Sequence, residues 1–171
     1  MRILAINGST RATSANGHFI EAITRLIGDR ADVSRYPSIA DLPHFNPDMD
    51  GEDPPDAVSH FRELVRACDA VLICTPEYAM GVVGSLKNAL DWLVSSSSLS
   101  GKPVMLVTAS LSGEKGHAAL LDTLRVIEAD VRPETSLLIP FAKTKVTADA
   151  VITDAQALSD VQHALNVLFA R

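Results

Sequence analysis

The sequence has few cysteines, few aromatic residues and no excess of basic residues. Its 171 residues include two cysteines, and aromatic residues make up 5% of the chain. The cysteines, at positions 68 and 74, suit neither a disulfide framework nor a Cys-x-x-Cys site. The 15 Lys and Arg residues against 21 Asp and Glu residues give a net charge of −6. This balance argues against duplex nucleic acid as a partner, because phosphate binding needs a basic surface.

Long apolar runs are also missing. No run approaches the roughly 18 residues of a membrane span. Residues 3–6, the apolar stretch after Met1 and Arg2, are too few for a signal peptide. The sequence therefore predicts a cytoplasmic protein with no membrane-spanning segment. Because 171 residues are typical of one domain, we expect residues 1–171 to form a single domain.

Strand and helix patterns alternate along the chain. Short apolar runs typical of buried parallel strands occupy residues 3–6, 31–36, 70–74, 103–109 and 136–139. After each run, apolar residues recur at steps of three and four, as in helices with one buried face. The proline-rich residues 37–56 indicate an irregular loop. Five strands alternating with five helices predict an α/β fold, a doubly wound five-stranded parallel sheet with helices on both faces.

Ligands of such sheets bind beyond the carboxyl ends of the strands, so three loops are candidates for a binding site. The first, residues 7–17, leads from a strand into a helix and combines Ser, Thr and Asn side chains with Arg11. Backbone N–H groups at a helix start, hydroxyls and a guanidinium suit a phosphate. The loop lacks the lysine of a P-loop and the G-x-G-x-x-G of a dinucleotide site. The alternative is an ordinary capped turn, which uses the same residue types.

The other two candidate loops, residues 75–92 and 110–117, differ in character. The first contains Tyr78, Met80 and two valines, so it can form the wall of a site for a flat ring. Packing under a partner subunit explains its apolar character equally well. The second contains small residues that let a ligand approach the backbone, and a plain strand-to-helix turn explains them too.

Several reactive side chains have ordinary structural explanations. The five histidines show no metal-ligand spacing, so no metal site is expected. Cys74 ends the most apolar run and is expected to be buried and inert. Glu77 is expected to make structural hydrogen bonds. Lys87 is expected to pair with Asp91 four residues later. Trp92 suits either the core or a subunit interface, and the interface is favoured because tryptophan is enriched there.

Two motifs in these loops resemble those of a known family. Residues 8–16, Gly-Ser-Thr-Arg-Ala-Thr-Ser-Ala-Asn, match its Gly-Ser-x-Arg-x-x-Ser-x-Asn loop. Pro-Glu-Tyr at residues 76–78 and Gly-Ser-Leu-Lys-Asn-Ala-Leu-Asp-Trp at residues 84–92 match its second, more specific motif. The chain thus resembles the NADPH-dependent FMN reductase family of flavodoxin-like proteins over most of residues 1–130. This resemblance implies the strand order 2-1-3-4-5.

The resemblance also implies a cofactor and an activity. FMN is the expected cofactor and NADPH, or NADH, the expected co-substrate, with a quinone, azo compound, flavin or metal oxyanion as small-molecule acceptor. No catalytic residue is expected, since the flavin ring itself takes the hydride. The residues expected to bind FMN are Ser9, Arg11, Ser14, Ala15 and Asn16 at the phosphate, Pro76, Glu77, Tyr78 and Ala79 at the ring, and Ser110 at the ring or ribityl chain. Since family members are commonly dimers or tetramers, we expect a homodimer or homotetramer.

Two positions depart from the family pattern, and one alternative function remains. Ala79 stands where the family has asparagine, and residues 114–117 replace a Gly-Gly pair. The alternative is a flavodoxin-type FMN-binding electron carrier without NAD(P)H activity. Such carriers usually combine a phosphate loop that lacks arginine with a strongly acidic surface. Arg11 and the moderate net charge of −6 favour the reductase.

Overall fold

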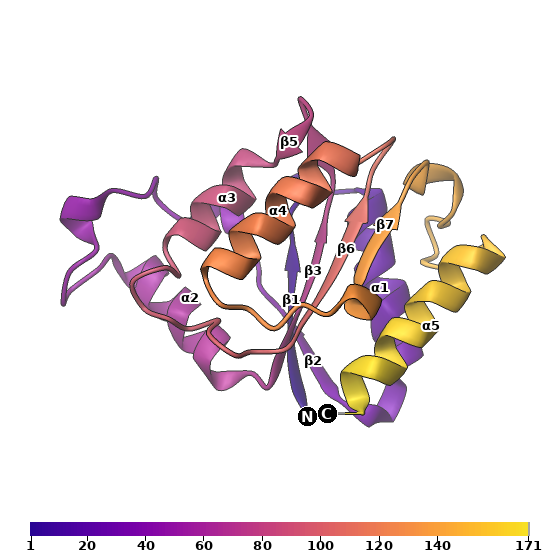
Figure 1. Ribbon diagram of the computed structural model, residues 1–171, viewed down its shortest axis with the longest axis horizontal. Helices are drawn as coiled ribbons and strands as arrows, with labels where there is room; N and C mark the ends of the chain where they lie inside the picture. Colours follow the sequence, from indigo (N-terminus) through magenta and orange to yellow (C-terminus); the bar gives the residue numbers. More distant parts are fainter. Residues whose placement is uncertain (171) are drawn as a thin grey trace.

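The strands form a parallel sheet in the computed structural model, which describes residues 1–170. The order of the strands is β2-β1-β3-β6-β7 (Figure 1). Their bounds are β1 (Arg2–Asn7), β2 (Asp32–Arg35), β3 (Ala70–Thr75), β6 (Val104–Ala109) and β7 (Ser136–Ile139). Neighbouring strands all run parallel. Counted along the chain, this order is the predicted 2-1-3-4-5.

Helices cover both faces of the sheet, as predicted. One face carries α1 (Ala15–Ile27) and α5 (Ala155–Phe169), and the other carries α2 (Asp56–Ala67), α3 (Gly84–Asp91) and α4 (Glu114–Val126) (Figure 1). Side chains alternate along a strand. Leu72 therefore packs with α1 and α5, whereas Val71 packs with the helices of the opposite face. Because both faces are covered, every residue of β3 is buried.

Short 3₁₀ helices occur in the connections. Their bounds are η1 (Gly28–Arg30), η2 (Ile39–Asp41), η3 (Pro47–Met49), η4 (Pro133–Thr135) and η5 (Ala142–Thr144). Two of them, η2 and η3, interrupt the proline-rich loop, which is otherwise irregular as predicted. None of the helices within residues 1–170 is long and apolar enough to cross a membrane.

A small hairpin follows β3 and was not predicted. Its strands β4 (Glu77–Tyr78) and β5 (Gly81–Val82) pair antiparallel. The two turn residues, Ala79 and Met80, have φ values of 49° and 58°, as in a type I′ turn. Strands of two residues are too short to show a periodic pattern. Asparagine adopts positive φ more readily than alanine, so the family's asparagine at position 79 suits the turn.

The prediction that Trp92 lies in a subunit interface is wrong. Its side chain is fully buried within the chain, and its indole N–H donates to the carbonyl oxygen of Pro43 at 2.8 Å. The side-chain amide of Asn88 donates to the same oxygen at 2.9 Å. Phe45 packs edge-on against the indole, with 5.0 Å between ring centroids. The proline-rich loop therefore folds back over the end of α3, a contact that the spacing of apolar residues does not reveal.

Candidate functional site

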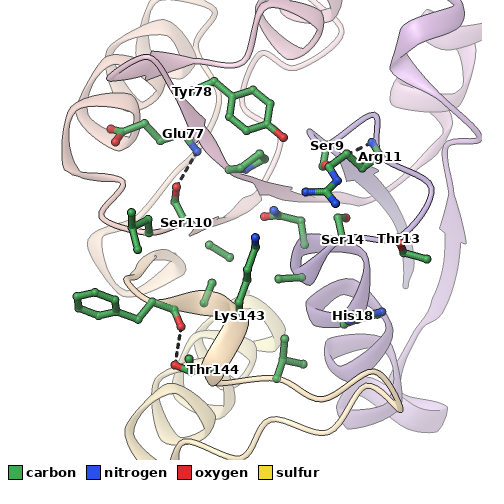
Figure 2. A pocket seen from close by; sticks show the side chains of 18 of the residues that line it. Ser9, Arg11, Thr13, Ser14, His18, Glu77, Tyr78, Ser110, Lys143 and Thr144 are labelled. Atoms are coloured by element: carbon green, nitrogen blue, oxygen red, sulfur yellow. Dashed lines mark hydrogen bonds between the residues drawn. The ribbon is translucent and has the colours of Figure 1, made fainter.

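A cavity opens at the carboxyl edge of the sheet (Figure 2). Its volume is about 710 Å³, which is the size of a small-molecule site. The loops after β1, β3, β6 and β7 surround it. Nine of the ten residues predicted to bind FMN line it, namely Ser9, Arg11, Ser14, Ala15, Asn16, Pro76, Glu77, Tyr78 and Ser110. The fold thus brings residues from three separate candidate loops to one place.

The loop after β1 is held in shape by its own side chains. Ser9 donates its N–H to Asn7 Oδ1 at 2.9 Å, and its Oγ accepts from the N–H of Arg11 at 3.4 Å. Ser14 caps α1, because its Oγ accepts from the N–H of Gly17 at 3.0 Å. The Arg11 side chain is exposed at the cavity. Hydroxyls, a helix start and an exposed guanidinium in this arrangement can bind an oxyanion.

Gly8 seats this loop against the end of β3. Its N–H donates to the carbonyl oxygen of Cys74 at 2.8 Å, and a Cβ at this position would lie 2.2 Å from Thr75 Oγ1. Below the loop, the Cys74 thiol donates to Asn16 Oδ1 at 3.3 Å, and burial raises the pKa of this thiol. Cys74 is therefore buried, as predicted, and stays in the unreactive thiol form.

Glu77 turns its carboxylate away from the cavity and caps α4 (Figure 2). The carboxylate accepts from the N–H of Gly116 at 2.6 Å and from the N–H of Gly113 and the hydroxyl of Ser112, each at 3.3 Å. These hydrogen bonds lower the pKa of the Glu77 carboxyl, and the bond from Gly116 has the largest effect. The predicted structural role is confirmed. The Glu77 carboxylate thus occupies the N-terminus of α4, where the helix dipole favours an anion.

Glu77→Gln is expected to lower the free energy of unfolding by about 1 kcal/mol, the usual loss at a helix cap. The backbone N–H groups favour the charged carboxylate, so its contribution is present above the unfolded pKa of a glutamate. It is lost as pH falls through the lowered folded pKa. Urea unfolding of variant and wild type at neutral and acid pH measures this, and the difference should shrink at acid pH. Glu63→Gln, at an exposed position of α2, is the control. An equal difference at both pH values would contradict the capping role.

Ser110 and Ala79 occupy different places. Ser110 Oγ accepts from the N–H of Glu77 at 3.1 Å, which ties the loop after β6 to the hairpin at the cavity wall. Among the described residues, those that line the cavity do not include Ala79, which lies at the hairpin turn. Its contact with a flavin ring stays a prediction.

One wall of the cavity was not predicted. It consists of residues that follow β7, namely Phe141, Ala142, Lys143, Thr144, Val146 and Ala148. The N–H of Phe141 donates to the carbonyl oxygen of Leu111, and that of Ala142 to the carbonyl oxygen of Ser110, each at 3.0 Å. A signal for this wall was present, because the carboxyl end of the fifth predicted strand lies at the same sheet edge as the others.

His117 links α4 to the strands β6 and β7. Its Nδ1 is 2.8 Å from Thr108 Oγ1 and its Nε2 is 3.1 Å from Ser136 Oγ. Burial lowers the pKa of its imidazole. Within residues 1–170, no group of three or more His, Cys, Asp or Glu side chains could hold a metal ion.

The sequence also matches a family model, described as NADPH-dependent FMN reductase, over residues 1–144. The chain belongs to this family. The matched residues include all five strands of the parallel sheet and the three predicted loops of the cavity.

Individual proteins match this chain over different shares of their length. The protein named quinone reductase of Escherichia coli (strain K12) is 37% identical over 114 residues, which cover 65% of this chain and 61% of that protein. An NAD(P)H-dependent FMN reductase of Pseudomonas aeruginosa is 32% identical over 174 residues, 98% of this chain and 93% of that protein. The solved structure of FerB, a flavoenzyme NAD(P)H:(acceptor) oxidoreductase from Paracoccus denitrificans, has a TM-score of 0.84 at 26% identity, covering 99% and 95% of the two chains. The match therefore spans less than two thirds of the E. coli protein but nearly all of the other two.

Proposed function

We propose that this chain is an FMN-dependent NAD(P)H oxidoreductase and that residues 1–171 form a single FMN-binding domain. The chemistry that bound FMN would supply is transfer of hydride from NAD(P)H and of electrons to quinone, azo, flavin or metal-oxyanion acceptors. Membership of the NADPH-dependent FMN reductase family supports this proposal. The observation that carries it is the convergence of nine residues of the predicted FMN site on one cavity.

The cavity lining offers groups suited to both the phosphate and the ring of FMN. Hydroxyls of Ser9 and Ser14 and the guanidinium of Arg11 supply donors for a phosphate. Pro76 and Tyr78 line the same cavity and supply flat or apolar surfaces for a ring. With this arrangement the protein itself would bind the flavin, orient it and exclude water.

Large apolar side chains at the cavity support two further parts of the proposal, the acceptor and the oligomeric state. Tyr78, Leu111 and Phe141 line it and are 48%, 75% and 61% exposed. Apolar surface at the mouth of a site suits an apolar acceptor or a partner subunit. We therefore include a small-molecule acceptor and a homodimer or homotetramer in the proposal. The net charge of −6 supports a function without nucleic acid, and we include a cytoplasmic location in the proposal.

A flavodoxin-type electron carrier is the alternative function. It would bind FMN in the same cavity. The family, described as NADPH-dependent FMN reductase, supports the enzyme. The exposed guanidinium of Arg11 at the cavity supports it as well.

The purified protein, mixed with FMN and desalted, is expected to keep a flavin absorption band that bleaches when NADPH is added without oxygen. An equal concentration of free FMN with NADPH is the control, and NADH replaces NADPH in a second trial. A retained band that neither nucleotide bleaches would favour the electron carrier. No retained band at saturating FMN would contradict the flavin site.

A further inference from the structure

The cavity carries two positive side chains that no acid of the described residues balances. Its charged lining residues are Arg11, Lys143 and Glu77, but the Glu77 carboxylate is directed to α4. Within residues 1–170, neither the guanidinium of Arg11 nor the ammonium of Lys143 takes part in a hydrogen bond or ion pair. The cavity is therefore electropositive and suited to an anionic ligand.

The backbone places Lys143 firmly at the cavity wall. Phe141 and Ala142, just before it, are bonded to the loop after β6, each at 3.0 Å, and Ala142 is 2% exposed. Figure 2 shows the Lys143 side chain extending from η5 into the cavity, toward the side that carries Arg11 and Ser14. Its neighbour Lys145 is instead held 3.7 Å from Asp154, the N-cap of α5.

We propose that Lys143 is a second cationic ligand for the phosphate of bound flavin and makes the site selective for FMN over riboflavin. The inference rests on the proposed function. A phosphate monoester carries a charge of about −1.5 to −2 at pH 7, which a single guanidinium does not neutralise. An ammonium on a flexible stem can approach the phosphate oxygens from the wall opposite the loop after β1. The pair Arg11 and Lys143 then matches the phosphate dianion in charge.

Lys143→Gln tests this inference by binding alone. We expect the Kd of the flavin-free protein for FMN to rise about tenfold, the effect of one charge-assisted contact, and its Kd for riboflavin to stay unchanged. Fluorescence quenching of each flavin during titration measures both values. Lys143→Arg should keep most of the preference for FMN, because it keeps the charge.

Lys115→Gln is the matched control. Lys115 is an exposed lysine of α4 outside the cavity lining, so this variant removes the same charge from the same edge of the sheet. It should leave both Kd values unchanged. An equal weakening in Lys115→Gln would show a general field effect and overturn the inference. An unchanged ratio of the Kd values for FMN and riboflavin in Lys143→Gln would also overturn the inference. A rise confined to the KM for NADPH would overturn it too, because it would place the phosphate of that nucleotide at Lys143 instead.

The proposed function fails separately from this inference. A wild-type protein that binds FMN and is not reduced by NADPH would remove the reductase activity and leave the selectivity for phosphate measurable. A Lys143→Gln variant that keeps its FMN-to-riboflavin ratio would remove the role of Lys143 and leave the reductase activity intact.

Discussion

Gly8→Ala is expected to abolish retention of FMN and to destabilise the fold. The added Cβ would lie 2.2 Å from Thr75 Oγ1, 2.5 Å from Thr75 Cβ and 3.1 Å from Thr75 Cα. Relief of this overlap must move the end of β1 away from β3, which breaks the 2.8 Å bond from Gly8 N–H to the Cys74 carbonyl. Overpacking of this kind costs about 1–3 kcal/mol, or roughly 2–4 °C in Tm per kcal/mol for a domain of this size.

Thermal unfolding and FMN retention after desalting measure the effect of Gly8→Ala. Gly84→Ala is the control, because nothing lies within 4 Å of the Cβ it would add at the start of α3. Alanine is also a better helix former than glycine, so this variant should match or exceed the wild type in Tm. A Gly8→Ala protein with wild-type Tm and FMN retention would show that the phosphate loop does not depend on its contact with Thr75.

Arg11→Ala is expected to raise the Kd for FMN by about 10- to 100-fold. The guanidinium is exposed at the cavity above a loop whose hydroxyls Ser9 and Ser14 also line the cavity. A hydrogen bond to a charged group contributes about 1.5–3 kcal/mol, and each 1.4 kcal/mol is about a factor of ten in Kd. Because the arginine would contact the phosphate, riboflavin should bind the variant and the wild type equally.

Equilibrium titration with FMN and riboflavin measures the effect of Arg11→Ala. Arg66→Ala removes an equal charge from the last turn of α2, near the edge of the sheet where β3 begins, and should leave both affinities unchanged. An unchanged Kd for FMN in Arg11→Ala would remove the assignment of the phosphate to the loop after β1. Raised ionic strength should weaken FMN binding to the wild type more than to the variant.

The strands were predicted well wherever both faces of a strand are buried. Every residue of β3 and of β6 is buried, and a continuous apolar run in the sequence indicates such burial. The fifth strand was also predicted at its observed bounds, residues 136–139, although β7 is only partly buried. The hairpin after β3 was missed because its strands have two residues each. Its turn also uses Ala79 and Met80 at positive φ, where Asn or Gly is the usual signal.

The candidate site was predicted in part, for a similar reason. Ser9, Arg11 and Ser14 could be found because they lie in one short loop between a strand and a helix. Their neighbours on the opposite wall, Phe141 and Lys143, follow the fifth strand and match no motif. They become part of the site only because β7 pairs with β6 and the backbone of η5 bonds to the loop after β6.

The amino-acid sequence by itself determined the alternation of strands and helices, the parallel sheet that follows from it, and the two motifs that indicate the family. These features depend on residues close together in the chain. Only the tertiary structure decided that Glu77 caps α4, that Trp92 is buried under the proline-rich loop, and that Lys143 shares a cavity with Arg11. Glu77 and Trp92 meet their partners across 39 and 49 residues of chain. Such contacts form only when the packed sheet brings distant segments together, so no pattern of neighbouring residues in the sequence predicts them.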